Sequence, residues 1–399
     1  MPSLFLQTRQ PKFCTQRLRR LLAHSAPMFI MCVMAGMLHA QNIIRVGPDQ
    51  ATKTLASAAA RAVDGDTFEV EAGEYRGDVA VWDKKNITVR AIGGRVRLIA
   101  SGMAAEGKGI WVLRGGAMTV QGIDFTGARV PDKNGAGIRL ESGRLTVRDC
   151  SFTDNQNGIL TSNNPMVELD ISDSEFGHNG YGDGQSHNLY VGEIAHLTVT
   201  GSYFHHAYVG HLLKSRAALN HILYNRLTDE IGGRASYELE LASGGIAYVI
   251  GNIIGQGSQT ENPHLISYGA EGYKWPKNEL YLINNTLVDN RPQGGIFLRI
   301  KPGNVTVKAV NNLLVGRGKL EAGGPGDYRN NFTVDWDAFE QASREDYRLK
   351  RSAGLSGKVV DAGFVNGQAL MQEREYIHPR RTQQLVAASR HPGALQSGR

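Results

Sequence analysis

The sequence predicts an all-β solenoid, in which short strands stack coil upon coil. Glycine accounts for 48 of the 399 residues and no long apolar run follows the N-terminal region, which together favour short strands and turns over helices. In addition, a phrase of the form V-x-x-(small or Asn)-x-(Phe, Leu or Ile) recurs at intervals of 23 to 33 residues. The apolar residue that ends each phrase falls at Phe125, Phe152, Phe176, Phe204, Leu227, Ile254, Leu287 and Leu314.

Other positions of the phrase also keep their residue type. Five positions before its end stands a β-branched residue or leucine in every phrase except the last. Two positions before its end stand Ile123, Cys150, Ser174, Ser202, Asn225, Asn252, Asn285 and Asn312. Coils stacked about 4.8 Å apart would align such residues and let asparagine side chains hydrogen-bond along a turn. A β-sandwich, the alternative, would not keep residue types in register over eight repeats.

The segment before the repeats differs from them. Residues 43–75 read as strand, short amphipathic helix, turn and strand. The Ala-rich stretch Thr54–Val63 is the expected helix, and Asp64-Gly65-Asp66 supplies the turn.

Together with this opening and the repeats, the phrase DYRLKRSAGLSGKVVDAG at 346–363 carries a family resemblance. From Ile43 to about Ala394 the sequence resembles the right-handed parallel β-helix (pectate-lyase-like) superfamily. The resemblance implies a short N-terminal capping helix and a single domain over 41–399. Its coils would occupy about 66–316, and a closing segment, 317–399, would end by lying back over the end of the stack.

Residues 1–40 read as a secretory signal peptide. A basic region extends to Arg20, an apolar stretch covers Met28–Leu38, and the small residue Ala40 precedes Gln41. Because the apolar stretch is too short to span a bilayer, we expect export to the periplasm or beyond, with no membrane span after its removal.

The net charge of +6 is concentrated in this leader. Five basic residues and no acid lie there, which leaves +1 for the remainder and no argument for nucleic acid as a partner: Arg9, Lys12, Arg17, Arg19 and Arg20. Without the leader Cys150 is the one cysteine left, so no disulfide framework is possible within one chain, and we expect a monomer.

A second strand follows each phrase, and these strands carry the charged residues. They read GIRL (137–140), GILT (158–161), HNLYVG (187–192), GHLLKSR (210–216), SYELEL (236–241), HLISYG (264–269) and GIFLRIK (295–301). Stacked, they would form one parallel sheet with alternate residues facing outward. With Leu213, Leu239 and Leu298 inward, the outward set is Asn188, Tyr190, Lys214, Arg216, Glu238, Glu240, Arg299 and Lys301. Lys214 and Glu238 are expected to be neighbours.

Such a face suits an acidic polysaccharide and predicts a lyase that works by β-elimination. The reaction must neutralise a uronate carboxylate, remove the proton at C5 and protonate the leaving oxygen. Lys214 is the candidate base, with its pKa lowered by a nearby cation, and Arg216 is the neutralising group. Tyr190 or His211 is the candidate acid. The expected substrate-binding residues are His187, Asn188, Glu238, Glu240, Arg299, Lys301, Tyr273 and Trp275.

Lys214-Ser215 carries a narrower resemblance. A strand reading V-K-S, followed about one coil later by a strand with arginine, marks the alginate lyase and chondroitinase B type of β-helix lyase. The strand one coil on is YELEL here, so Glu238 and Glu240 replace the expected arginine and leave its role to Arg216 or Arg234. Those lyases often hold Ca²⁺ through oxygen ligands, which Glu238 and Glu240 could supply.

Several alternatives stay open on the sequence alone. The same groove would serve a non-catalytic carbohydrate-binding or exopolysaccharide-assembly protein, or a C5-epimerase, which shares the proton-abstraction step. A charged strand face can also be merely solvated. Tyr273 and Trp275 could stack on sugar rings or cover the coil's own core. No metal-ligand spacing stands out among the histidines, and no carboxylate pair suited to hydrolysis is evident.

Overall fold

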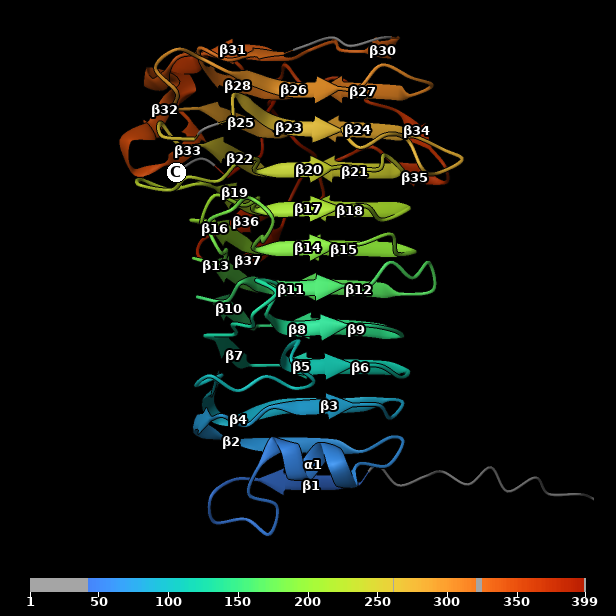
Figure 1. The fold of residues 1–399 in the computed structure, drawn as a ribbon. Coiled ribbons are helices and arrows are strands. Elements are labelled where there is room, and N and C mark those ends of the chain that lie inside the picture. Colours follow the sequence, from blue (N-terminus) through green and yellow to red (C-terminus); the bar gives the residue numbers. More distant parts are fainter. Residues whose placement is uncertain (1–41, 261, 321–324, 398–399) are drawn as a thin grey trace, which may run out of the picture. The chain divides into compact units, whose positions relative to one another are not determined.

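The computed structural model describes residues 42–260, 262–320 and 325–397, and it is a stack of coils with three short strands in each coil (Figure 1). One strand of every coil belongs to a ten-stranded parallel sheet. Its members are β3 (Ala80–Trp82), β5 (Gly109–Leu113), β8 (Ala136–Leu140), β11 (Asn157–Thr161), β14 (Leu189–Val191), β17 (Leu213–Ser215), β20 (Leu239–Leu241), β23 (His264–Tyr268), β26 (Ile296–Ile300) and β29 (Lys319–Leu320). The predicted right-handed parallel β-helix is confirmed.

The other two strands of each coil form a 21-stranded sheet made of two parallel ladders. The first ladder contains β6 (Ala117–Gln121), β9 (Arg144–Arg148), β12 (Glu168–Ser172), β15 (His196–Thr200), β18 (Leu219–Leu223), β21 (Ile246–Ile250), β24 (Glu279–Ile283), β27 (Thr306–Val310) and β30 (Gly326–Asp327). The second contains β7 (Ile123–Thr126), β10 (Ser151–Thr153), β13 (Glu175–Gly177), β16 (Tyr203–His205), β19 (Arg226–Thr228), β22 (Ile253–Gln256), β25 (Thr286–Asp289), β28 (Leu313–Gly316) and β31 (Phe332–Val334). Three N-terminal strands begin the sheet, and the last of them pairs with both β6 and β7: β1 (Ile43–Val46), β2 (Thr67–Arg76) and β4 (Ile87–Ile99).

The apolar column predicted from the repeated phrase lies in the core. Phe125, Phe152, Phe176 and Phe204 pair in register on successive coils, and all four are fully buried. Their rings stack with centroids 4.9, 4.8 and 4.7 Å apart, close to the spacing of adjacent strands. The phrase therefore recurs because each coil must supply a large apolar side chain at the same point, which is phenylalanine on these four coils and leucine or isoleucine on the next four.

The predicted asparagine column is also confirmed. The Asn252 Oδ1 accepts hydrogen bonds from the backbone N–H of Asn225 (2.8 Å) and from its Nδ2 (3.1 Å), and Asn285 does the same for Asn252. Each Nδ2 also donates to a backbone carbonyl, such as Val199 O. These side chains are fully buried, so the ladder satisfies turn amides that have no strand partner.

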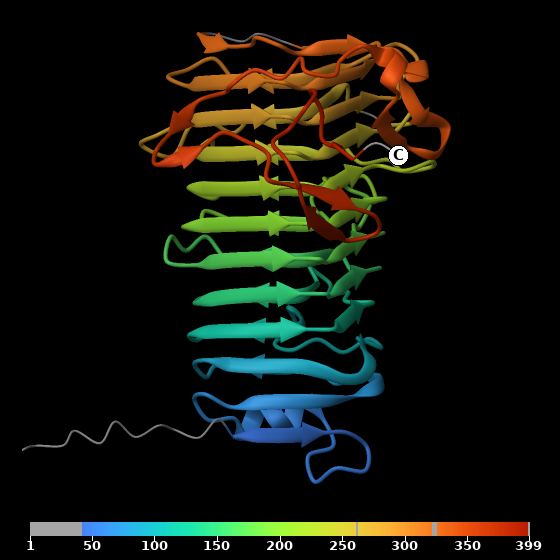
Figure 2. The same ribbon diagram turned by 180° about the vertical axis from the view of Figure 1, so that it is seen from behind.

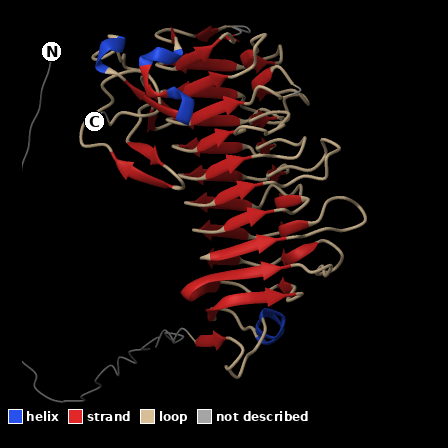
Figure 3. Ribbon diagram, turned by 90° about the vertical axis from the view of Figure 1, so that its left-hand side faces the viewer, coloured by secondary structure: helices blue, strands red, loops and turns tan. Residues whose placement is uncertain are grey.

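Helix α1 (Leu55–Arg61) covers the first coil, as the sequence predicts (Figure 3). The Thr54 hydroxyl caps its N-terminus by accepting from Ser57 N. The Asp78 carboxylate accepts hydrogen bonds from the first two amides of the helix, Leu55 N at 2.6 Å and Ala56 N at 2.8 Å, which have no partner within the helix. None of the helices in the described ranges combines the length and apolar character needed to cross a membrane.

The closing segment runs along the side of the stack, and not over its end as predicted (Figure 2). Its antiparallel hairpin of β36 (Arg374–Ile377) and β37 (Arg381–Gln384) reaches back to the middle coils, where Arg380 donates to Cys150 O at 3.1 Å. The remaining elements are β32 (Phe339–Gln341), β33 (Asp346–Leu349), β34 (Phe364–Val365), β35 (Gln368–Ala369) and three 3₁₀ turns, Trp336–Ala338, Ala342–Arg344 and Arg351–Ala353. They pack on apolar side chains that the coils leave outside their core.

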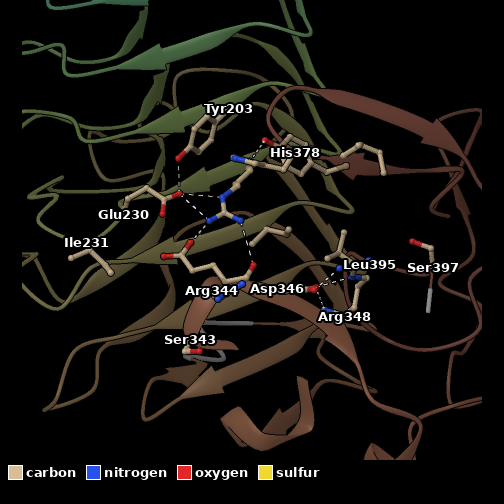
Figure 4. A pocket seen from close by; sticks show the side chains of 15 residues that line it. Tyr203, Glu230, Ile231, Ser343, Arg344, Asp346, Arg348, His378, Leu395 and Ser397 are labelled. Carbon is tan, nitrogen blue, oxygen red and sulfur yellow. Dashed lines mark hydrogen bonds and ion pairs between the residues drawn. The ribbon is translucent and has the colours of Figure 1, made fainter. Parts of the chain in front are cut away.

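A cavity of about 480 Å³ lies where this segment crosses the coils (Figure 4). Its centre is the buried guanidinium of Arg226, which pairs with Glu230 at 2.9 Å and with Glu345 from the closing segment. The Tyr203 hydroxyl donates to the same Glu230 carboxylate at 2.7 Å. The ion pair between Arg226 on β19 and Glu345 joins the closing segment to the stack.

We expect Asn252→Ala to lower the free energy of unfolding by about 1–3 kcal/mol, because it leaves the buried Asn225 amide without an acceptor. The urea midpoint measures this. Asn290→Ala is the matched control, since Asn290 is exposed and its change should stay within about 0.5 kcal/mol. Equal midpoints for the two variants would contradict a contribution of the asparagine hydrogen bonds to the free energy of unfolding.

Candidate functional site

The outward residues of three neighbouring strands of the ten-stranded sheet meet at one place. Tyr190 on β14 pairs in register with Lys214 on β17, and Lys214 pairs with Glu240 on β20. Leu213 and Leu239 face the core, as predicted. The expected neighbour of Lys214 was Glu238, and this was wrong: alignment of the two leucines places Glu240 beside the lysine.

Four charged side chains form a continuous set of ion pairs. The Lys214 ammonium lies 2.9 Å from Glu240 Oε2 and 2.9 Å from Glu271 Oε1. The Arg216 guanidinium binds the Glu271 carboxylate through two hydrogen bonds, of 2.6 and 2.8 Å. Glu271 comes from the loop after β23, so two basic residues of the sheet hold a carboxylate that a loop supplies.

The surroundings of these groups keep them ionised. Burial lowers the pKa of Lys214, but the Glu240 and Glu271 carboxylates outweigh it, and the net direction is upward. The hydrogen bonds from Arg216 lower the pKa of Glu271 to about 2. Burial raises the pKa of Glu240, and contacts with His211 and Lys214 reverse that direction. Lys214 is therefore a cation between two carboxylates, and not the neutral amine that the predicted base would require.

A column of aromatic side chains runs beside the charged one. The rings of His187 and His211 stack at 4.3 Å, Tyr237 meets His211 edge-on at 5.0 Å, and His264 follows Tyr237 at 6.2 Å. Each residue stands two positions before an inward leucine or isoleucine on successive coils. That spacing is a sequence signal for Tyr237 and His264, which were not among the predicted site residues.

The imidazole of His211 is held by Glu240. Its Nε2 lies 3.0 Å from Glu240 Oε2, and its Nδ1 is buried without a hydrogen-bond partner in the described part of the chain. Burial lowers the pKa of His211, and more strongly that of His187, so both rings are neutral near pH 7. A carboxylate that orients one ring nitrogen leaves the other as a proton acceptor.

Tyr190 faces the two cations. Its ring centroid lies 5.1 Å from the guanidinium carbon of Arg216 and 5.9 Å from the Lys214 ammonium. Arg299 and Lys301 lie further along the same sheet and are exposed to solvent. The predicted outward positions of Tyr190, Lys214, Arg299 and Lys301 thus share one face of the stack.

The two loop aromatics brace the loop that carries Glu271. The hydroxyl of Tyr273 donates to Lys301 O at 2.5 Å, and the indole of Trp275 donates to Arg216 O at 2.9 Å. Both side chains are half-buried. Their use as stacking platforms for sugar stays a prediction, but their contacts fix the loop against the sheet.

Asn188 and Glu238 do not face outward as predicted. Each stands immediately before an inward leucine, at a position that is also buried on other coils, as the equivalent Leu265 shows. Asn188 is fully buried, and its Nδ2 donates to His205 O at 2.8 Å. Glu238 is also fully buried, and the charges nearest to it are Asp229, Asp289 and Arg291.

Glu240 faces Lys214 and His211, so Glu238 and Glu240 lie in separate surroundings. They do not converge on one point, and the pair does not fit a calcium site.

Comparison with known proteins places the fold. No protein-family model matches the chain, and no curated protein matches its sequence. Among solved structures, the pectate lyase Pel9A superposes with a TM-score of 0.54 at 12% identity, over 90% of this chain and 97% of that one. The protein has the parallel β-helix fold of this pectate lyase.

Two further matches have lower scores. The ORF18 protein of Geobacillus virus E2 gives a TM-score of 0.45 at 13% identity, over 69% of this chain and 54% of that chain. A PL6 family polysaccharide lyase from Pseudopedobacter saltans gives a TM-score of 0.32 at 13% identity, over 78% of this chain and 97% of that chain. At 12% identity the Pel9A match shows the fold alone, and the chemistry must be argued from the side chains.

We expect Glu238→Gln to increase the free energy of unfolding at neutral pH, where the buried Glu238 side chain destabilises the wild type. Burial, with Asp229 and Asp289 adding to it, raises the pKa of Glu238 well above its ordinary value. The folded chain then keeps a proton that the unfolded chain releases, so this group's stability is present below about pH 4 and is lost as the pH rises.

Urea unfolding across this pH range measures the effect. The variant should match the wild type at low pH and exceed it progressively toward neutrality. The exposed Glu340→Gln removes the same charge and serves as control. A difference that does not change with pH would contradict the assignment.

Proposed function

We propose that this β-helix protein binds a uronate-containing polysaccharide along the ten-stranded sheet and cleaves it by β-elimination. One observation carries the proposal: Arg216 and Lys214 already hold a carboxylate, that of Glu271, with two hydrogen bonds from the guanidinium and one from the ammonium. A planar guanidinium that binds both carboxylate oxygens is suited to a sugar carboxylate as well.

The other cations extend this site along the stack. Arg299 and Lys301 are exposed on the same sheet, on a strand two coils beyond that of Glu240. Because successive coils lie about 4.8 Å apart, the basic groups form a row along the stack rather than a compact patch. A row of cations fits a linear polyanion laid across the strands.

β-Elimination needs a base, an acid and a neutralised carboxylate. The base takes the C5 proton, the electron pair forms the C4–C5 double bond, and the C4–O4 bond breaks as the acid protonates the leaving oxygen. We assign the base to neutral His211, which Glu240 orients, and the acid to Tyr190. Lys214 and Arg216 stabilise the negative charge that develops on the carboxylate.

The free protein differs from the substrate complex in two respects. The substrate carboxylate takes the place of Glu271, whose loop lies at the surface. The Nδ1 of His211 is covered in the free protein, so the rings of His187 and Tyr237 must rotate when the sugar binds.

The deciding experiment is an ultraviolet assay for unsaturated uronate with a panel of uronate polysaccharides, with and without calcium. His211→Ala should lower kcat by about 100-fold or more, the usual range for a general base. Arg216→Ala should also raise KM, because it removes the carboxylate contact. Arg144→Ala, an exposed and ion-paired arginine of the 21-stranded sheet, is the matched control and should keep full activity.

Other outcomes separate the alternatives. Binding without unsaturated product would favour a non-catalytic binding protein, unless deuterium from heavy water enters C5, which identifies an epimerase. If neither binding nor turnover occurs with any polyuronate, the proposal is wrong.

We expect Glu271→Gln to tighten the binding of oligouronates, because a neutral amide competes less well for Arg216 and Lys214. The dissociation constant, measured by calorimetry, should fall several-fold and the affinity should depend more steeply on salt. Glu193→Gln, a half-buried residue that follows β14 on a neighbouring coil, is the control for net charge. Weaker binding by the Glu271 variant would show that the carboxylate contacts the sugar instead of standing in for it.

A further inference from the structure

A second cluster of titratable side chains lies away from the ion pairs, where the second ladder of the 21-stranded sheet turns toward the ten-stranded sheet. Its members stand two residues after successive marker phenylalanines: Asp154, His178 and His206, each in the left-handed backbone region, with φ of 57°, 56° and 46°. His205, adjacent to His206, is buried beneath them. The repeat that aligns the phenylalanines thus also aligns these turn residues.

The imidazole nitrogens of three of these residues converge. One ring nitrogen from each of His178, His205 and His206 lies within 4.8 Å of the others. Among the described residues, no other set of three His, Cys, Asp or Glu side chains comes this close together. The Nδ1 atoms of His205 and His206 are 2.8 Å apart. Two nitrogen ligands of a tetrahedral zinc, each about 2 Å from the ion, lie about 3.3 Å apart, so a small ring rotation suffices.

The outer nitrogens determine what can sit between the rings. His205 Nε2 faces the Glu175 carboxylate at 3.4 Å, and His206 Nε2 faces the carbonyl of Ile231 at 3.3 Å. Both partners are acceptors. If each ring carries one proton, on Nε2, its Nδ1 lone pair is directed toward the other ring. Two lone pairs at this distance repel unless a cation lies between them.

The same pattern is typical of histidines that bind metals. A ligating imidazole usually donates its second ring N–H to a carboxylate or a backbone carbonyl, which fixes its orientation. Glu175 and the Ile231 carbonyl occupy these positions here.

A cavity of about 420 Å³ adjoins the cluster. His178 and His206 line it together with Asp154, Arg129, Tyr181, Tyr208 and Arg234. The Arg234 guanidinium lies over the Tyr208 ring at 5.0 Å, and Asp154 places a carboxyl group at the rim. An ion held by the three rings would therefore have one side turned to solvent.

We propose that His178, His205 and His206 bind one divalent transition-metal ion of the zinc class, with a coordination position open toward this cavity. The site is separate from the residues assigned to β-elimination. The ion would tie together the starts of two loops, one after β13 that ends at His187 and one after β16 that ends at His211.

The test uses the full chain without a polyhistidine tag, freed of metal by a chelator. Titration with Co²⁺ should give one ion per chain with the visible absorption of a four-coordinate site, and Zn²⁺ should displace it. His178→Ala should weaken the affinity for either ion more than tenfold. Glu175→Gln should weaken it by about 10–100-fold, the usual effect of removing such a carboxylate.

His196→Ala is the matched control. His196 and His221 form another pair with ring nitrogens 2.9 Å apart, but no third histidine of the described ranges joins them, so this variant should bind Co²⁺ like the wild type. The alternative is a proton shared by His205 and His206 and no metal. Absence of stoichiometric Co²⁺ binding, or unchanged affinity in His178→Ala, would overturn the proposal.

Discussion

The structure depends on the strict register of its parallel coils. Each strand residue lies above its equivalent in the preceding coil, so a side chain beside a strand must fit the same geometry as its neighbours on the adjacent coils. The stacked rings of Phe125 to Phe204 and the hydrogen-bonded amides of Asn225 to Asn312 are two solutions to that requirement. The same register aligns Tyr190, Lys214 and Glu240 on successive coils, and it also aligns His178 with His206.

Register also explains how much the sequence could predict. The buried column, the asparagine ladder and the capping helix follow from residue types that recur at one spacing, and all were predicted. The pairing of Lys214 with Glu240 could have been predicted too, because the inward Leu213 and Leu239 fix it. The error lay in placing Asn188 and Glu238 outward, at a position that is buried on successive coils, as Leu212 and Leu265 show.

Contacts that depend on the path of a loop or of the closing segment had no such signal. Glu271 reaches Arg216 because Trp275 and Tyr273 anchor its loop to the sheet, and no periodicity reports that path. The hairpin of β36 and β37 reaches the middle coils for a similar reason. The three-histidine cluster combines both kinds of information: its column follows from the phenylalanine repeat, whereas the orientation of its rings depends on tertiary contacts with Glu175 and Ile231.

Helix α1 has a consequence for association between molecules. A parallel stack ends in strands whose outer backbone groups have no partner, and such an edge can pair with another chain. At the first coil the helix stands in the way, with its N-terminal amides tied to Asp78. The far end of the ten-stranded sheet is the two-residue strand β29, which offers few groups for pairing. A chain without the helix would therefore leave the first edge of the ten-stranded sheet open to pairing with another chain.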